Sequence, residues 1–295
     1  SYALELSDII RKSDALMEKV KPDALLILGD TYSGLSIMPA VNRGIKVFHM
    51  EAGLRAWDKR MPEQRNRILI DHMSDILLPY NKYHRENLIK ENIHPSKIFC
   101  TGNTTFEVMR EFSQEINNSE ILDRLKLESK KYILLTAHRS ENVDNMEYLH
   151  RIMESAGLIS ERFKYEVIYP MHPRTKSKLA TLKIPKGVRI IDPLGFYDFN
   201  HLLKESFCVL SDSGTAAEEG IFYKVPNVSL RMATERPETV ESGSTIVSGM
   251  RLENIIESIE TAVTLPWHAK YDFAENHSPS SVVINTIRSQ ITNFF

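Results

Sequence analysis

A strand-like run that ends in a small-residue turn constrains this chain most. Residues 207–210 are apolar, residues 211–214 read Ser-Asp-Ser-Gly, and residues 216–222 have the composition of a helix. A strand, a tight turn and a helix start present backbone N–H groups and the positive end of a helix to a phosphate. Glu219 stands about one turn inside the predicted helix, within reach of a ribose hydroxyl pair. The segment indicates a nucleotide or nucleotide-sugar site, and an ordinary helix-capping turn is the alternative.

The rest of the chain repeats this alternation of short apolar strands and helices. Strands are predicted at residues 23–28, 45–50, 74–79, 97–101, 132–137, 165–169, 188–191, 207–211 and 227–230. Helices are predicted at residues 2–20, 35–43, 63–73, 83–92, 146–163, 199–205, 216–222 and 280–295. Such strands separated by helices form parallel sheets that are covered on both faces, so the fold class is α/β.

Two doubly wound domains are predicted. The polar segment 113–131 precedes a fresh strand at residue 132, and the last helix can fold back on the first domain. The predicted domains are residues 1–104 with 281–295, and residues 105–280, with a ligand cleft at the carboxyl ends of their strands. The first domain opens on a helix where such a domain usually opens on a strand. We therefore expect a first strand and its phosphate-facing loop to be missing from this sequence.

Composition argues against several partners. The 295 residues are 42% hydrophobic and carry a net charge of -2, which gives no reason to expect nucleic acid or an anionic membrane as partner. No apolar run reaches about 18 residues and no signal peptide is visible, so the cytoplasm is the expected compartment. Cys100 and Cys208 lack metal-ligand spacing and lie in or beside apolar runs, which predicts buried free thiols.

Side chains suited to acid–base chemistry follow the predicted strands. They are Asp30, Glu51, Glu63 and His138. Asp30 has a structural alternative as a turn former, Glu63 as a complement to a helix dipole, and His138 as a core imidazole. Glu51 is hardest to explain structurally, because a carboxylate that ends an apolar strand faces the crevice. Together the three carboxylates and the histidine indicate a catalytic site.

Six ordered motifs resemble the UDP-N-acetylglucosamine 2-epimerase family. They are His-Met-Glu-Ala-Gly-Leu-Arg at 49–55, Met-Pro-Glu-Gln-Arg-Asn-Arg at 61–67, Thr-Gly-Asn at 101–103, Ala-His-Arg-Ser-Glu-Asn at 137–142, Asp-Ser-Gly-Thr-Ala-Ala-Glu-Glu at 212–219 and Thr-Glu-Arg-Pro-Glu at 234–238. The resemblance covers essentially the whole chain. It implies a glycosyltransferase-B-like fold of two Rossmann-type domains and epimerisation at C2 of a UDP-amino-sugar. It also implies a homodimer, a UDP-sugar and UDP as bound partners, and no metal or redox cofactor.

The resemblance also implies roles for single residues. Asp30, Glu51 and Glu63 are the implied acid/base carboxylates, and His138 lies at the implied active site. The implied binding residues are Ser213, Gly214 and Thr215 for the diphosphate, Glu219 for the ribose, Phe199 near the uracil, Arg236 for a phosphate or the sugar, and Arg55 and Arg139 for the substrate more generally.

Elimination and re-addition account for the implied reaction. The C2 proton beside an acetamido group is not acidic, so direct abstraction would leave a poorly stabilised carbanion. A base that removes this proton while UDP leaves C1 gives a 2-acetamidoglucal and UDP. Re-addition of UDP, with a proton delivered from the other face, inverts C2. The reaction needs carboxylates at the sugar, and cations and N–H donors at the diphosphate, where charge develops.

Three departures from the family pattern favour alternatives to UDP-N-acetylglucosamine as the substrate. The Gly-Thr-Arg-Pro loop of the family is absent from this sequence, Thr215 replaces a second glycine, and Met-His-Pro-Arg-Thr at 171–175 replaces a His-x-Asn-Pro run near a regulatory substrate site. With Trp-Asp-Lys-Arg at 57–60, these departures favour the capsule or O-antigen branch, so a 6-deoxy or diacetamido UDP-sugar is an alternative substrate. A glycosyltransferase of the same fold and a catalytically silent binder are further alternatives, and neither needs three strand-end carboxylates.

Overall fold

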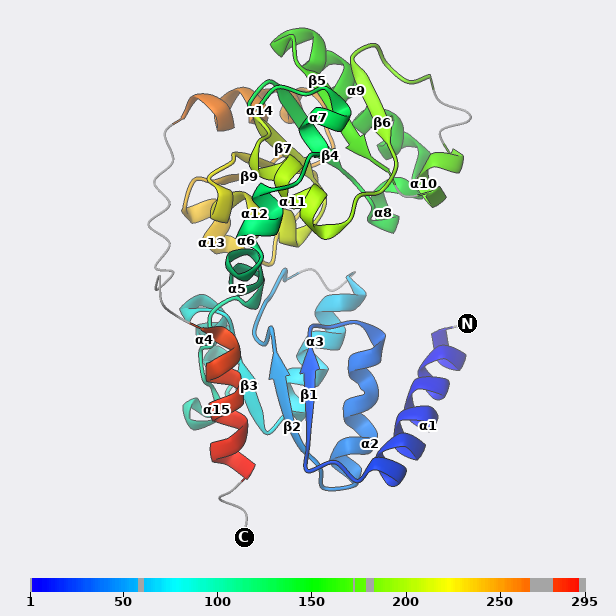
Figure 1. The fold of residues 1–295 in the computed structure, drawn as a ribbon. Helices are drawn as coiled ribbons and strands as arrows, with labels where there is room; N and C mark the ends of the chain where they lie inside the picture. Colours follow the sequence, from blue (N-terminus) through cyan, green and yellow to red (C-terminus); the bar gives the residue numbers. More distant parts are fainter. Residues whose placement is uncertain (1, 58–60, 172, 179–182, 266–277, 292–295) are drawn as a thin grey trace. The chain divides into compact units, whose positions relative to one another are not determined.

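The chain divides into two compact units. The computed structural model describes residues 2–57, 61–171, 173–178, 183–265 and 278–291 (Figure 1). Unit 1 comprises Ser1–Glu107 with Phe273–Phe295, and unit 2 comprises Val108–Asp272. Helix α5 (Thr104–Glu111) contains the division between them. Each unit has its own parallel sheet and its own apolar core.

Unit 1 is built on a three-stranded parallel sheet of order β1-β2-β3. The strands are β1 (Ala24–Leu28), β2 (Lys46–Met50) and β3 (Ile76–Leu78). The predicted strand at 97–101 is wrong, because a 3-10 turn leads into it and Ile98 forms a single isolated bridge with Leu77. Cys100, in the same segment, is exposed, so the predicted buried thiol is wrong there, whereas Cys208 is buried.

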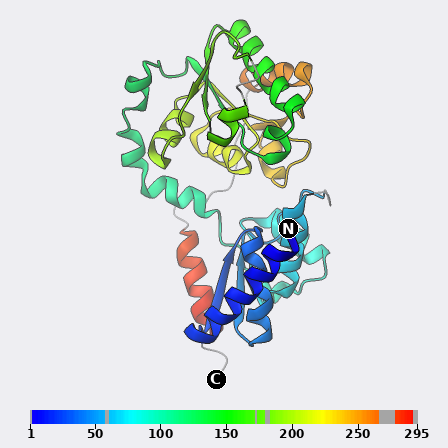
Figure 2. The ribbon, with the colours of Figure 1, turned by 90° about the vertical axis from the view of Figure 1, so that its right-hand side faces the viewer.

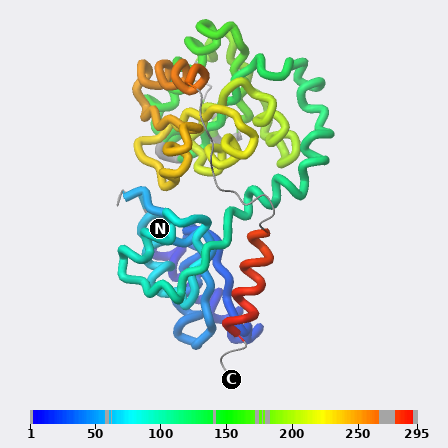
Figure 3. The backbone as a smooth tube through the Cα atoms, turned by 90° about the vertical axis from the view of Figure 1, so that its left-hand side faces the viewer, coloured from blue at the N-terminus to red at the C-terminus, as the bar shows by residue number. Residues whose placement is uncertain are grey.

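Helices cover both faces of this sheet. On one face Met17 of α1 and Ile70 of α3 pack with Val47 of the sheet. On the other face Val283 of α15 packs with Phe48. Figures 2 and 3 show α15, in red, alongside the strands of this unit. The helices are α1 (Tyr2–Val20), α2 (Ile37–Asn42), α3 (Pro62–Met73), α4 (Lys82–Lys90) and α15 (Pro279–Ile291), with 3-10 turns η1 (Tyr32–Ser36) and η2 (Pro95–Lys97).

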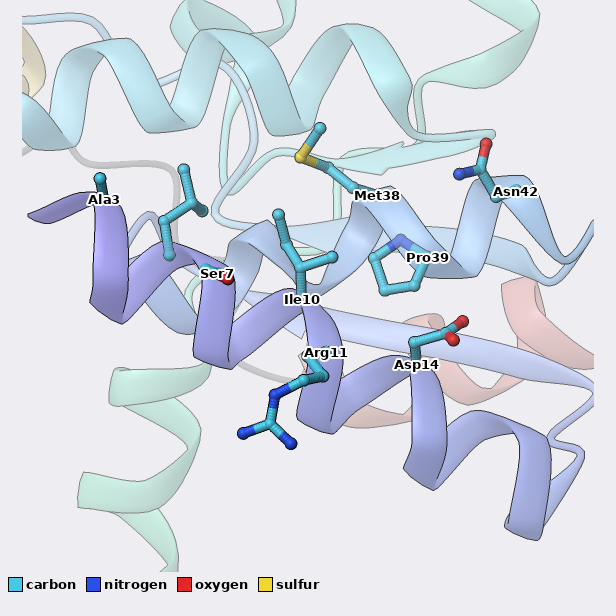
Figure 4. Close-up of a pocket in the computed structure, with 9 residues that line it drawn as sticks. Ala3, Ser7, Ile10, Arg11, Asp14, Met38, Pro39 and Asn42 are labelled. Atoms are coloured by element: carbon cyan, nitrogen blue, oxygen red, sulfur yellow. The ribbon is translucent and has the colours of Figure 1, made fainter.

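A groove lies between α1 and α2, with a volume of about 720 Å³ (Figure 4). It is lined mainly by apolar side chains and by one arginine and one aspartate. The lining residues are Ala3, Leu6, Ser7, Ile10, Arg11, Asp14, Met38, Pro39 and Asn42. None of the predicted site residues contributes to it, so the groove is separate from the candidate active site.

Unit 2 contains a six-stranded parallel sheet of order β6-β5-β4-β7-β8-β9. The strands are β4 (Tyr132–Thr136), β5 (Glu166–Pro170), β6 (Val188–Ile191), β7 (Cys208–Ser211), β8 (Asn227–Ser229) and β9 (Thr245–Val247). The sequence did not predict β9, in which only Ile246 and Val247 are apolar. The chain runs outward from β4 to β6, then restarts at β7 and runs outward the other way. This order places a switch point between β4 and β7, where doubly wound sheets bind ligands.

Helices cover both faces of the second sheet as well. Leu135 of β4 packs with Ile159 of α9 and Ile255 of α14, whereas its neighbour Leu134 packs with Leu203 of α11 on the opposite face. Because successive strand residues point to opposite faces, a strand buried on both sides is apolar throughout. The helices are α6 (Ser113–Asn117), α7 (Ile121–Leu125), α8 (Ser140–Val143), α9 (Met146–Phe163), α10 (Pro173–Lys178), α11 (Phe196–Lys204), α12 (Gly214–Tyr223), α13 (Pro237–Glu241) and α14 (Leu252–Thr264).

Candidate active site

Two loops leave the switch point of unit 2 side by side. β4 and β7 pair in parallel with Thr136 opposite Ser211, so the loops that follow them start at the same edge of the sheet. The first loop carries His138 and Arg139, and the second carries Ser213 and enters α12. The structure therefore brings together candidates that are about 75 residues apart in the sequence.

Asp212 joins these two loops. Its side chain is 0% exposed, and its carboxylate accepts the backbone N–H of His138 at 3.1 Å, the backbone N–H of Arg139 at 3.0 Å and the side-chain amide of Asn142 at 3.0 Å. Nδ1 of His138 lies 3.6 Å from Oδ1 of Asp212. The His138 side chain is 56% exposed, so the structural alternative of a core imidazole is wrong. Sequence reasoning gave Asp212 no role, although it lies in a quoted motif.

The start of α12 has the geometry of an anion site. Ser213 is the N-cap residue, but its side chain makes no capping hydrogen bond and its Oγ lies 2.9 Å from Oγ1 of Thr215. A Cβ atom on Gly214 would lie 2.4 Å from Nη1 of Arg236, so glycine lets this guanidinium approach the first turn. Two hydroxyls, an arginine and helix N–H groups thus gather where a diphosphate can bind.

Arg236 belongs to a buried charge network. Its Nε donates to Glu218 at 2.7 Å and its Nη1 donates to Glu235 at 2.6 Å. Arg231 also donates to Glu235 at 2.7 Å, and Nη2 of Arg139 lies 3.9 Å from the same carboxylate. Burial alone would raise the pKa of Glu235, but Arg236, Arg231 and Arg139 hold it well below its ordinary value. The network fixes the arginine beside α12.

Glu219 lies further along α12 and is 9% exposed. Its carboxylate forms no hydrogen bond with any residue that the structure describes. Burial, together with the charge of the neighbouring Glu218, raises the pKa of Glu219 to about 7. A buried carboxylate of this kind gains stability from two incoming hydroxyl donors. Phe199 of α11 is half-buried and packs in the apolar cluster that includes Ala216 of α12.

In unit 1, two carboxylates share one arginine. Asp30 follows β1 and Glu51 follows β2, and these neighbouring parallel strands end at one edge of the sheet. Nη2 of Arg67 pairs with the Asp30 carboxylate and lies 3.4 Å from Oε2 of Glu51. Glu51 has a φ of 64°, a left-handed conformation that costs energy for a residue with a side chain. Such strain concentrates at functional sites.

The first turns of α3 hold these loops. Gln64 accepts the backbone N–H of residue 56 at 2.8 Å, and the side-chain amide of Asn66 donates to the carbonyl oxygen of Asp30 at 2.9 Å. Glu63 and Arg67 are four residues apart and lie on the same face of α3. Sequence reasoning assigned only Glu63 from this motif and missed Arg67, although the spacing of four was available as a signal.

Arg55 is a structural residue, which corrects its prediction as a substrate-binding one. Its side chain is 0% exposed, and its Nε and Nη2 donate to Glu91 at 2.7 and 2.6 Å. The same Nη2 lies 2.7 Å from Oδ2 of Asp71. Asp71 also accepts the N–H of Gly53 at 3.1 Å and lies 2.7 Å from Nδ1 of His49. The guanidinium is saturated by two carboxylates and supports the turn after β2.

Among the described residues, no group of three or more His, Cys, Asp or Glu side chains is arranged to hold a metal ion. No helix in the same part of the chain is long and apolar enough to cross a membrane. Residues 58–60 and 172, which belong to the predicted departures from the family pattern, lie outside the described residues.

Comparison with known sequences decides the family. A sequence model of the UDP-N-acetylglucosamine 2-epimerase family matches residues 1–280. The chain belongs to this family. A UDP-N-acetylglucosamine 2-epimerase from Methanococcus maripaludis is 34% identical over 298 residues, 97% of this chain and 81% of that protein. A UDP-2,3-diacetamido-2,3-dideoxy-D-glucuronate 2-epimerase from Pseudomonas aeruginosa is 34% identical over 264 residues, 88% of this chain and 71% of that protein.

Solved structures agree with the family and the fold. The UDP-GlcNAc 2-epimerase of Methanocaldococcus jannaschii in complex with UDP-GlcNAc and UDP is 34% identical, with a TM-score of 0.89 over 98% of this chain and 82% of that chain. The spinosyn rhamnosyltransferase SpnG, 12% identical with a TM-score of 0.52, shares the fold alone. The predicted fold class, α/β and glycosyltransferase-B-like with two Rossmann-type domains, is confirmed.

Proposed function

We propose that this family member is an isomerase that interconverts UDP-GlcNAc and UDP-ManNAc by epimerisation at C2. The observation that carries the proposal is the pair of carboxylates, Asp30 and Glu51, held by Arg67 at the carboxyl ends of neighbouring strands. Inversion at carbon needs one group that removes a proton and a second that returns it to the other face. Two partly buried carboxylates with a shared cation supply such a pair.

The two units have different roles in this proposal. Unit 1 supplies the acid/base groups, with Glu63 as the third carboxylate on the same helix face as Arg67. Unit 2 binds UDP, and its charged network and α12 start support that role. The proposed ligand contacts are Ser213, Gly214, Thr215 and Arg236 at the diphosphate, His138 and Arg139 beside it, Glu219 at the ribose and Phe199 near the uracil.

The proposed reaction proceeds by elimination. A carboxylate takes the C2 proton, the C1–O bond breaks, and the bonding electrons leave with UDP, so that the products are a 2-acetamidoglucal, UDP and a protonated carboxyl. Negative charge grows on the diphosphate in this step, and preorganised cations and N–H donors stabilise it. UDP then re-adds to C1 while an acid delivers a proton to the opposite face of C2. The scheme uses no metal or redox cofactor.

The sugar substituents have a second candidate. The relative from Pseudomonas aeruginosa that acts on a diacetamido-glucuronate is as identical to this chain as the relative from Methanococcus maripaludis. A modified UDP-sugar for surface polysaccharide synthesis is therefore the alternative substrate. A homodimer is a further part of the proposal, and light scattering of the full-length gene product tests it.

Proton NMR in heavy water tests the proposal. The full-length gene product is incubated with UDP-GlcNAc, and we expect the C2 proton signal to disappear while UDP-ManNAc appears. Accumulation of free ManNAc and UDP would identify a hydrolysing enzyme. Absence of exchange with UDP-GlcNAc, together with exchange in a UDP-diacetamido sugar, would select the alternative substrate. Absence of exchange in both, with intact UDP binding, would favour a glycosyltransferase.

A further inference from the structure

Asp212 is the fully buried charged group at the switch point of unit 2, and the proposed reaction gives it no part. Asp212 directly follows β7, and it is 0% exposed beside the loop that follows β4. We propose that Asp212 is a positioning residue that fixes His138 and Arg139 relative to the start of α12. This inference rests on the proposed function, because it concerns the groups that stabilise the leaving UDP.

The contacts of Asp212 link three loops. The backbone N–H groups of His138 and Arg139 and the side-chain amide of Asn142 all donate to its two oxygens at 3.0–3.1 Å. The same amide of Asn142 also donates to the carbonyl oxygen of Leu230 at 3.2 Å, at the start of the loop that carries Arg236. One buried carboxylate therefore sets the relative positions of three loops: the loop after β4 with His138, the loop after β7 that enters α12, and the loop after β8 with Arg236.

A carboxylate is the side chain that suits this position. It accepts hydrogen bonds at both oxygens and donates none, which matches three converging N–H donors. Hydrogen bonds to a charged acceptor are also stronger than neutral ones. All three donors lie within 3.1 Å of Oδ2, and the N–H of His138 also lies 3.1 Å from Oδ1. An asparagine with its oxygen at the Oδ2 position would therefore place its NH2 group against the N–H of His138 and would remove the negative charge of the acceptor. Both changes move the loop or cost stability.

The position of His138 follows from this arrangement. Its backbone is held by Asp212, and Nδ1 lies 3.6 Å from the same carboxylate. The imidazole is more than half exposed, so its place follows mainly from the backbone that Asp212 holds rather than from packing. Because the diphosphate carries more negative charge in the transition state than in the bound substrate, displaced donors weaken the transition state more than the ground state. Loss of Asp212 should therefore lower kcat more than it raises KM.

The experiment compares Asp212→Asn with a matched control, Asp75→Asn. Asp75 also accepts a backbone N–H, that of Val47 at 2.8 Å, but it lies at the opposite end of the strands in unit 1. For Asp212→Asn we expect kcat per folded molecule to fall about 100-fold, with KM changed less than about 3-fold. The ¹⁵N signals of the His138 ring should also shift. Asp75→Asn should lose some thermal stability and keep wild-type kcat.

Two results would overturn the inference. One is a kcat for Asp212→Asn equal to that of Asp75→Asn. The other is measured on the unmodified protein, which covers the case that Asp212→Asn does not fold. We expect the amides of His138 and Arg139 to exchange with solvent at least about 100-fold more slowly than unprotected loop amides. Exchange at the rate of unprotected amides would show that Asp212 does not accept their hydrogen bonds. If the unmodified protein shows no C2 exchange, the proposed function fails, whereas amide exchange still decides the position of the loop.

Discussion

The strand ends of the two sheets carry opposite chemistry. In unit 1 the loops after β1 and β2 carry Asp30 and Glu51, with Arg67 as the shared cation. In unit 2 the loops after β4, β7 and β8 carry exposed His138, the start of α12 and buried Arg236. Both edges are built from parallel strands covered by helices. The architecture therefore sets where polar groups stand, and the residue types distinguish the edge that we propose to transfer protons from the edge that we propose to bind an anion.

Each edge also has a buried aspartate beneath it, and the two differ in their partners. Asp71 in unit 1 is held by Arg55 and His49. Burial alone would raise the pKa of Asp71, but His49 and Arg55 hold it below its ordinary value. Asp212 in unit 2 is held mainly by backbone and amide N–H groups. A buried arginine therefore helps to fix the turn after β2 in unit 1, whereas N–H donors fix the loops after β4 and β7 in unit 2.

Glu51→Gln should have the largest effect on the reaction, and it acts at the edge of unit 1 that carries Asp30 and Glu51. The variant keeps the shape of the side chain and removes the base, so we expect C2 exchange to fall about 10³-fold or more. UDP affinity should not change, because UDP is assigned to unit 2. Proton NMR in heavy water and calorimetry with UDP measure the two quantities. Glu18→Gln, an exposed carboxylate of the same unit, is the control. Wild-type exchange would remove Glu51 from the mechanism.

Glu219→Gln tests the buried carboxylate on α12, which forms no hydrogen bond with the residues that the structure describes. Burial raises its pKa to about 7, so the folded chain retains a proton between pH 4.5 and 7 that the unfolded chain releases. The wild-type protein therefore loses stability as pH rises through this range, by about 3 kcal/mol above pH 7. The glutamine variant cannot lose this proton. In urea unfolding it should match the wild type near pH 4 and exceed it by up to that amount at pH 8.

The same substitution tests the ribose assignment. Ribose hydroxyls donate to an ionised carboxylate, so uridine should bind the wild type more tightly at pH 8 than at pH 6. Uridine is the better probe because it lacks the phosphate of UDP, which titrates in the same range. Glu219→Gln should bind uridine more weakly at pH 8, with no pH dependence. An unchanged affinity would show that another group receives the ribose.

The sequence predicted most of the fold because burial on both faces leaves a clear pattern. β4, buried on both sides, is apolar at Tyr132–Thr136 apart from its last residue, and such runs are recognisable alone. Two segments show the limit of such patterns. β9 has only two apolar residues and was not predicted, and the segment at 97–101 has the apolar content of a strand but pairs through a single bridge. Whether such a segment becomes a strand depends on the strand it pairs with, and the local sequence pattern does not identify that partner.

The site shows the same limit at single residues. Arg55 and Arg67 both lie in recognisable motifs, and both are arginines near acidic residues in the sequence. Only the fold shows that Arg55 is saturated by Asp71 and by Glu91, which lies 36 residues away. Arg67 instead contacts the candidate acid/base pair. Motifs identified the right loops, but the partner of each guanidinium is set by long-range contacts.

His138→Asn should lower the reaction rate less than Glu51→Gln does, and it acts at the edge of unit 2 that is proposed to bind the diphosphate. The imidazole is more than half exposed, so the variant should fold and unfold as the wild type does. We expect kcat to fall about 100-fold, or about 3 kcal/mol of transition-state stabilisation, because one donor to the leaving diphosphate is lost. Steady-state kinetics measure it. His150→Asn, an exposed histidine of α9, is the matched control, and equal rates for the two variants would return His138 to a structural role.

Thr215→Gly should have the smallest effect and sharpens the role of backbone N–H groups at the anion-binding edge. Thr215 is exposed, and its Oγ1 contacts Oγ of Ser213 at 2.9 Å, so the hydroxyl pair is the only described side-chain contact that the variant removes. Glycine in the first turn should lower the free energy of unfolding by about 0.5–1 kcal/mol. UDP affinity, measured by calorimetry, should change less than about 5-fold, because the N–H groups of α12 remain. Thr215→Ser keeps the hydroxyl and should match the wild type. A loss of more than 10-fold with glycine and none with serine would move UDP recognition from the helix N–H groups to the hydroxyl pair.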